Sequence, residues 1–362
     1  MSHPAESPEN SLYNERPAVR AWLVAICVLI TAMVSIGGVT RLTGSGLSIT
    51  DWKPIMGAIP PLSHAEWEIA FAKYREIPQF RVVNSTMDLA QFKSIFFWEY
   101  FHRLVGRLIG VVTFLPGLYF WARGRISKRL AARALLGIVL GGLQGALGWF
   151  MVMSGLSERV SVSHFRLAAH LSLALVILSY FVALTRSVFT GDRPVSPAER
   201  PTRAFLRPKF KWIAALFALQ IVYGAFVAGL KAGFAFNTFP LMAGGFAPPN
   251  LLALDPAWTN AFENPATVQW IHRCLGWLAF FSANALWIAL LRRKAPRGPI
   301  RRWTTGLAHM TIAQFALGIA TLVLVVPVPL AALHQLGAAV IVILLTLLGH
   351  TLTRRDDLEN RP

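Results

Sequence analysis

Four histidines within long apolar stretches have the clearest chemical potential in this chain. They form two pairs, His102 with His170 in the first half and His272 with His334 in the second. Each lies about six or seven residues, or roughly 10 Å of helix, inside the N-terminal end of its stretch. Two imidazoles at equal depth on facing helices can ligate one iron from both sides. The pattern therefore predicts two bis-histidine heme sites.

The simpler role for a single histidine within a membrane is a hydrogen bond to a neighbouring helix. Ionisable residues there are costly, and four at matched depth in two repeat-related pairs favour iron ligation. The cysteines, Cys27 and Cys274, show neither Cys-x-x-Cys nor Cys/His spacing, so the sequence predicts no zinc site and no disulfide.

Basic and small residues flank the histidines. Arg103 and Arg107 follow His102, and Arg273 directly follows His272. An arginine beside a heme can bind a propionate through charge-assisted hydrogen bonds, and the alternative is extension to lipid headgroups. The recurrence of arginine after histidine in both halves favours propionate contacts. Several glycines nearby either make room for a flat macrocycle or allow close helix packing. They are Gly106, Gly110, Gly145, Gly148, Gly276 and Gly318.

The two predicted sites differ at one position. Glu99 lies three residues, about one helical turn, before His102, whereas Gln269 holds the matching place before His272. A carboxylate in one site alone indicates proton handling or stabilisation of a developing cation there. The alternative is a solvent-facing acid at a helix start, where the helix dipole favours it. The cost of placing a glutamate in a membrane favours a catalytic role for Glu99.

Membrane-spanning helices must position these residues. Hydrophobic residues make up 55% of the 362-residue chain, and long apolar stretches recur, each able to cross a bilayer core, which takes about 20 residues. We expect an all-α integral membrane protein with eight transmembrane helices, arranged as two pseudo-twofold-related four-helix bundles. The predicted spans are residues 20–39, 95–121, 131–153, 163–186, 211–229, 265–291, 303–326 and 329–351.

The formal net charge of +18 follows membrane topology rather than a nucleic-acid surface. Lysine and arginine cluster in alternate short gaps between the spans, which is the positive-inside pattern of cytoplasmic loops. Both termini are therefore predicted to be cytoplasmic, with the histidines toward the periplasmic side. No nucleic acid is expected to bind. The N-terminus resembles neither a signal peptide nor a transit peptide, so a bacterial inner membrane is the simplest location.

The two halves of the chain resemble each other. EYFHRLVGRLIG, which begins at Glu99, aligns with QWIHRCLGWLAF, which begins at Gln269, and LQGALG around Gln144 aligns with AQFALG around Gln314. Because each unit holds an even number of spans, the repeats are expected to be parallel. The predicted domains are an N-terminal tail 1–19, an N-terminal half 20–190 with one histidine pair, a linker 191–210, a C-terminal half 211–352 with the other pair, and a tail 353–362.

One long outer loop follows the first span of each half. One runs from Arg41 to about Lys93 and the other from Lys231 to Glu263. The segment GSGLSITDWKPIMG in the first loop corresponds weakly to KAGFAFNTFPLMAG in the second. Loops of this length in a compact protein usually have a function, and covering a site is one.

Seven segments carry a resemblance to a known family. They are GGVTRLTGSGLSITDW, FFWEYFHRLVGR, LQGALGWFMVMSGL, VSHFRLAAHLSLAL, NTFPLMAG, VQWIHRCLGW and ALHQLGA. Each alone is weak, but together they are highly specific. Through them the chain resembles the heme A synthases of alphaproteobacteria and mitochondria over roughly residues 20–350.

The resemblance implies a reaction that composition does not indicate. Successive hydroxylations would oxidise the C8 methyl of heme O to a formyl group, which supplies heme A to cytochrome c oxidase. By the same resemblance, His272 and His334 bind a permanent heme B, and His102 and His170 hold the heme O substrate. Glu99 corresponds to the family's important acid. The implied partners are heme O, the farnesyltransferase that produces it, oxidase assembly factors and membrane lipid, with a homo-oligomer left open.

The chain departs from some members of that family, and two other classes compete with it. Some bacterial members carry a cysteine pair in the first outer loop, but residues 41–93 contain no cysteine. A diheme cytochrome b for electron transfer would typically stack its hemes across the membrane, whereas these histidines all lie near one face. A repeat-built transporter would need broken helices at the midplane and no heme.

Overall fold

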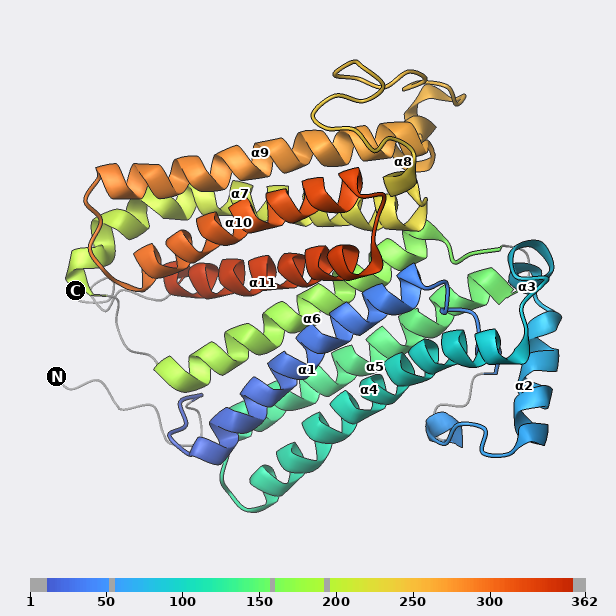
Figure 1. The fold of residues 1–362 in the computed structure, drawn as a ribbon. Helices are drawn as coiled ribbons and strands as arrows, with labels where there is room; N and C mark the ends of the chain where they lie inside the picture. Colours follow the sequence, from blue (N-terminus) through green and yellow to red (C-terminus); the bar gives the residue numbers. More distant parts are fainter. Residues whose placement is uncertain (1–11, 52–55, 157–159, 192–195, 354–362) are drawn as a thin grey trace.

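The computed structural model describes residues 12–51, 56–156, 160–191 and 196–353. Among these residues, eight helices are long and apolar enough to cross a membrane, as predicted. They run side by side along the molecule (Figure 1). These helices are α1 (Pro17–Leu42), α4 (Leu89–Ala122), α5 (Lys128–Leu156), α6 (His164–Thr190), α7 (Arg200–Gly229), α9 (Pro265–Arg292), α10 (Pro299–Val323) and α11 (Val328–Thr353).

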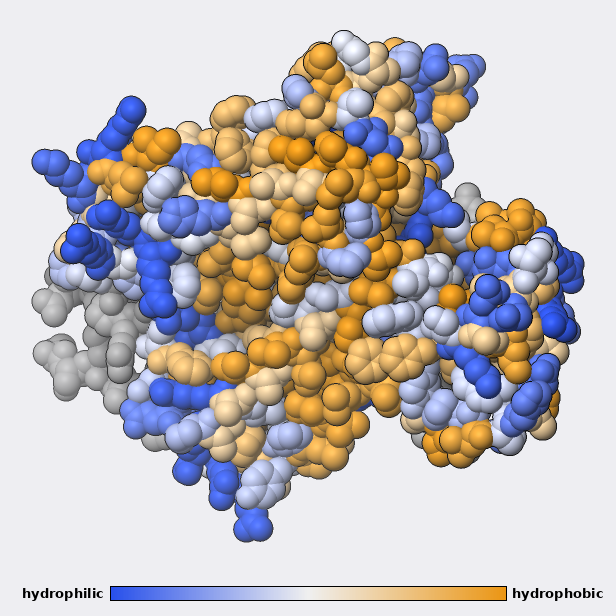
Figure 2. Space-filling model, in the orientation of Figure 1, coloured by the Kyte–Doolittle hydropathy of each residue, from blue (hydrophilic) through white to orange (hydrophobic). Residues whose placement is uncertain are grey.

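The surface of the bundle is suited to lipid. Apolar side chains form a band over its middle, and hydrophilic side chains gather toward the two ends (Figure 2). Val28, Leu143 and Val176 on three different helices are 60%, 55% and 58% exposed. Such exposure would be costly in water and is favourable in hydrocarbon. The chain is therefore a multi-pass membrane protein.

Each half forms a closed ring of four helices. In the first half α1 packs on α4, α4 on α5, α5 on α6 and α6 on α1, and in the second half α7, α9, α10 and α11 pack in the same order. The halves meet where α1 contacts α11, α6 contacts α7 and α6 contacts α11. A twofold axis would exchange the first two of these contacts and preserve the third. This pattern supports the predicted pseudo-twofold arrangement, which stays a prediction together with the cytoplasmic placement of the termini.

Side-chain packing explains how closely the helices approach. In the first half the ring of Trp22 on α1 lies 5.5 Å from that of Phe120 on α4, between ring centroids. Phe181 of α6 fills the place that a side chain at Gly137 of α5 would need. Between the halves, Gln335 of α11 donates a 2.7 Å hydrogen bond to the Val34 carbonyl of α1. Polar contacts of this kind fix how one apolar helix is rotated against another.

Two helices begin six or more residues earlier than the sequence predicts. α4 starts at Leu89, where Asp88 and Gln91 form a reciprocal capping box. α7 starts at Arg200, inside the predicted linker 191–210, with a proline in its first turn. Residues 200–210 of the predicted linker are therefore helical, and the division of the chain into halves and a linker stays a prediction. The predicted tails and the first part of the linker lie largely outside the described residues.

The outer loops carry short elements. The first loop contains α2 (His64–Arg75), which packs against the start of α4 through an aromatic cluster that includes Phe71, Tyr74 and Phe92, and α3 (Pro78–Val83), which contacts α2 and α5. The second loop contains α8 (Asn260–Glu263). Single 3-10 turns occur at Met56–Ala58, Pro197–Glu199, Ala232–Phe234 and Ala257–Thr259.

Candidate heme sites

The predicted ligand histidines lie on helices that face each other across each ring. His102 is on α4 and His170 on α6, which are separated by α1 and α5 in the first ring. His272 on α9 and His334 on α11 are placed in the same way in the second ring. The members of each pair are close enough to interact electrostatically. The structure thus brings each predicted pair together within its own half.

A glycine on a neighbouring helix lies against each of the four imidazoles. The distances from the histidine Cε1 atom to the position that a Cβ would take are 3.0 Å for His102 at Gly37, 3.0 Å for His170 at Gly148, 3.1 Å for His272 at Gly224 and 2.9 Å for His334 at Gly318. All four are shorter than ordinary van der Waals contact. A larger residue at any of these glycines would displace the ring beside it.

Two glutamines hold the backbone of the ligand helices. Gln144 of α5 donates through Nε2 to the His170 carbonyl at 3.0 Å, and Gln314 of α10 donates to the His334 carbonyl at 2.7 Å. The repeated LQGALG and AQFALG motifs mark these residues in the sequence, but their role was not predicted. Each glutamine fixes the height of one ligand helix relative to its neighbour.

The residues present fit a heme held by two histidines. The Nδ1 atoms of His102, His272 and His334 are buried without a hydrogen-bond partner among the described residues. Burying such a nitrogen costs free energy, so it calls for an explanation. Paired imidazoles with glycines beside them suit axial ligation of a flat macrocycle. The described part of the chain holds no cluster of three or more His, Cys, Asp or Glu side chains that would bind a bare metal ion.

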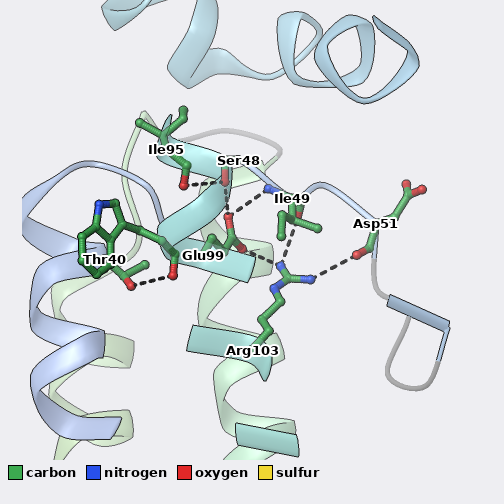
Figure 3. Close-up of polar contacts among 8 residues, drawn as sticks. Thr40, Ser48, Ile49, Asp51, Ile95, Glu99 and Arg103 are labelled. Atoms are coloured by element: carbon green, nitrogen blue, oxygen red, sulfur yellow. Dashed lines mark hydrogen bonds and ion pairs between the residues drawn. The ribbon is translucent and has the colours of Figure 1, made fainter. Parts of the chain in front are cut away.

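Glu99 is buried at the join between α4 and the first outer loop (Figure 3). Its carboxylate accepts hydrogen bonds from the Ser48 hydroxyl at 2.8 Å and the Ile49 amide at 2.9 Å. Arg103, one turn further along α4, forms an ion pair with it at 2.6 Å. The Arg103 guanidinium also donates to the carbonyls of Ile49 and Asp51 at 2.9 and 3.2 Å. With a side chain only 4% exposed, Glu99 is not the solvent-facing acid of the alternative interpretation.

The second half repeats this arrangement without the negative charge of the carboxylate. Arg273 donates to the carbonyls of Phe236 and Thr238, both at 2.8 Å. Gln269 donates to the same Phe236 carbonyl at 3.1 Å. In the matched loops, Ala235 takes the place of the serine that binds Glu99. The scaffold is shared, and the carboxylate and its hydroxyl donor belong to the first half alone.

The predicted arginines have a second role in the structure. Arg103 and Arg273 each bind two carbonyls of an outer loop, so both anchor the loop that follows the first span of their half. Arg107 lies one turn below Arg103 on α4 and is partly buried. The propionate contacts of these three residues stay predictions.

The predicted glycines divide by what they face. Gly148 and Gly318 contact predicted ligand histidines. A Cβ placed at Gly106 would lie 3.3 Å from the Met33 Cε atom, and one placed at Gly276 would lie 3.3 Å from the Gln220 Nε2 atom. No atom lies within 4 Å of a Cβ placed at Gly110 or Gly145. Sequence reasoning missed Gly37 and Gly224. Their matching places in the first span of each half, SIGGVT and VYGAFV, were the available signal.

Comparisons with known proteins agree with this architecture. The family described as cytochrome oxidase assembly protein matches residues 20–346. A relative from Rhodospirillum centenum named heme A synthase is 48% identical over 353 residues, which cover 96% of this chain and 92% of the relative. Proteins of the same name from Azorhizobium caulinodans and Nitrosomonas eutropha are 48% and 44% identical, over 90% and 94% of this chain and 91% and 95% of their own length. The chain belongs to the cytochrome oxidase assembly protein family.

Proposed function

We propose that the chain is a heme A synthase, a membrane oxidoreductase that oxidises the C8 methyl of heme O to a formyl group and so supplies heme A to cytochrome c oxidase. The observation that supports the proposal is two repeat-related pairs of histidines, of which only the His102–His170 pair has a buried carboxylate, Glu99, on a ligand helix. Two equivalent electron carriers would need no such difference. The relatives named heme A synthase support the same conclusion.

The two sites receive different roles in this proposal. His272 and His334 hold a resident heme B, with Arg273 beside it, and His102 and His170 hold heme O as substrate. The location of Glu99 in the first half supports this assignment. A bound heme B would supply one-electron redox chemistry. The protein would lie in a bacterial inner membrane, with the heme sites toward the periplasm and with the heme O-producing farnesyltransferase and oxidase assembly factors as partners.

The residues around Glu99 perform three tasks. Ser48 and the Ile49 amide fix one carboxylate oxygen, and Arg103 fixes the other, so the carboxylate is oriented before substrate binds. From that position Glu99 takes up a proton or stabilises positive charge at the methyl carbon as it is oxidised. The same contacts tie the first outer loop to α4, which keeps water away from this end of the site.

The test is co-expression with an enzyme that makes heme O, followed by purification, pigment extraction and mass analysis. We expect heme A or heme O beside heme B. Replacing His102 with alanine should remove heme O and heme A and leave heme B, whereas the matched His272→Ala variant should lose heme B. A protein that carries two equivalents of heme B and neither heme O nor heme A would instead be a diheme electron carrier, and the proposal would fail.

A further inference from the structure

A groove runs between the two halves, away from the histidines. It is lined by α1, α6 and α11 and has a volume of about 610 Å³, within the range of about 300–1,000 Å³ that is usual for ligand pockets. Its α1 wall extends from Val24 to Ser35 and is mostly apolar. That wall is about 16 Å long at 1.5 Å per residue, or about half of a 30 Å hydrocarbon core. The groove therefore spans the depth of one lipid leaflet.

Three arginines surround the end of the groove near the basic loops. Arg186 lines it, and its Nε atom is buried without a hydrogen-bond partner among the described residues. Arg302 is near enough to interact electrostatically with Arg186, and the two charges repel. The Arg20 guanidinium lies 4.9 Å above the ring of Phe189, which also lines the groove. Within the described ranges, no carboxylate forms an ion pair with Arg186.

We propose that this groove binds an anionic phospholipid from the leaflet on the basic side, with one acyl chain along α1 and the phosphate at Arg186. The apolar wall matches a chain in length, and the phosphate supplies the negative charge that the described side chains do not. Basic pockets between transmembrane helices on the cytoplasmic side are suited to anionic headgroups. The inference is independent of the proposed enzymatic activity.

The isoprenoid tail of heme O is the competing occupant, and the geometry argues against it. Gly37 of α1 faces His102 inside the first ring, whereas Ser35, two residues earlier, lines the groove. Two residues correspond to about 200° around a helix. The groove and the candidate heme site therefore lie on opposite faces of α1. A hydrocarbon tail also has no negative charge that could pair with the arginines.

The position of the groove suggests what the lipid does. Its walls come from both halves, since α1 and α6 belong to the first ring and α11 to the second. A chain lying between them buries apolar surface of both. Bound lipid should therefore stabilise the contact between the halves.

The experiment uses the purified full chain in neutral detergent and native mass spectrometry. Phosphatidylglycerol and phosphatidylcholine with identical acyl chains are titrated separately. We expect one phosphatidylglycerol per chain, bound at least tenfold more tightly than phosphatidylcholine. Arg186→Gln should weaken phosphatidylglycerol binding about fivefold, the contribution of one arginine near an anionic surface. Arg207→Gln, an exposed arginine of α7 outside the groove, is the matched control and should bind normally.

A second variant tests the chain-binding part of the groove. Ala32 lines the groove and is exposed, so Ala32→Phe should fill the groove without disturbing the core and should weaken phosphatidylglycerol binding with all three arginines intact. The heme absorbance spectrum of each variant verifies folding, and Arg186→Lys should restore binding if Arg186→Gln does not fold. Equal binding of the two lipids, unchanged binding by Arg186→Gln, or displacement of the lipid by heme O would each overturn the proposal.

Discussion

The contact between Gly318 and His334 allows a quantitative test of the second heme site. A Cβ at Gly318 would lie 2.9 Å from the His334 Cε1 atom, whereas ordinary contact begins at 3.4 Å. Gly318→Ala therefore produces an overlap of about 0.5 Å with the imidazole ring of His334. The ring cannot move away together with its helix, because that helix is held by the hydrogen bond from Gln314 to the His334 carbonyl.

The size of the effect follows from the cost of overpacking. Inserting a methyl group into a packed site typically costs about 1–3 kcal/mol, and here the cost falls on the position of His334, the proposed iron ligand. Since 1.4 kcal/mol is a tenfold change in affinity, heme binding in this half should weaken about 5- to 150-fold. The helix itself should not suffer, because alanine is favoured over glycine in a helix interior by about 1 kcal/mol.

The assay is the heme content per chain together with the absorbance spectrum of the purified protein. Gly318→Ala should lower the heme B content or shift the spectrum away from that of a bis-histidine heme. Gly141→Ala on α5 is the control, because nothing lies within 4 Å of a Cβ there, and its heme content should be normal. Full heme content and an unchanged spectrum in Gly318→Ala would refute the proposal that the position of the His334 ring depends on the lack of a side chain at this glycine.

Three further outcomes are expected. Glu99→Gln should keep its heme B but lower heme A formation about 100-fold or more; normal heme A in this variant would contradict a catalytic role, and Gln269→Glu should not affect the first site. Arg273→Gln should speed amide hydrogen exchange in the second outer loop about tenfold or more, because it removes two charge-assisted bonds to loop carbonyls; unchanged exchange would show that the loop is held elsewhere. Two backbone amides hold the pKa of Glu66 below its ordinary 4.5, so its contribution to the cap of α2 should be present above pH 4.5 and be lost as the pH falls through the lower pKa of the folded state; an NMR titration that gives 4.5 or more would contradict this.

Which histidines pair along the bundle could be predicted from the sequence, and the rotation of each helix about its axis could not. Counting residues from the start of each apolar stretch placed His102 and His170 at one level, because a helix rises by a constant amount per residue. Whether the rings face a neighbouring glycine depends on how each helix is turned and how closely it packs. Gly37 and Gly224 were missed for that reason, although their counterparts Gly148 and Gly318 were noted.

Contacts made by loops were beyond sequence reasoning for a related cause. The family resemblance marked Glu99 as important, and the burial cost of a carboxylate favoured a functional site. Nothing in the pattern indicated that Ser48, about fifty residues earlier, would donate to it, because a loop of this length can adopt many paths. The early start of α7 at Arg200 was missed because its first turns are polar, so that the apolar stretch begins later than the helix does.

The difference between the two halves is one of charge rather than shape. In each half an arginine binds two loop carbonyls at corresponding positions, and a glycine contacts each predicted ligand ring. What changes is the direction of one set of hydrogen bonds: the Glu99 carboxylate accepts from the loop at a place where the Gln269 amide donates to it. A duplicated unit can thus keep its heme-binding geometry in both copies while only one copy holds a buried negative charge. In the proposed function, general acid–base chemistry needs that charge and heme binding does not, so one substitution with its serine partner would separate the proposed reactive site from the proposed heme B site.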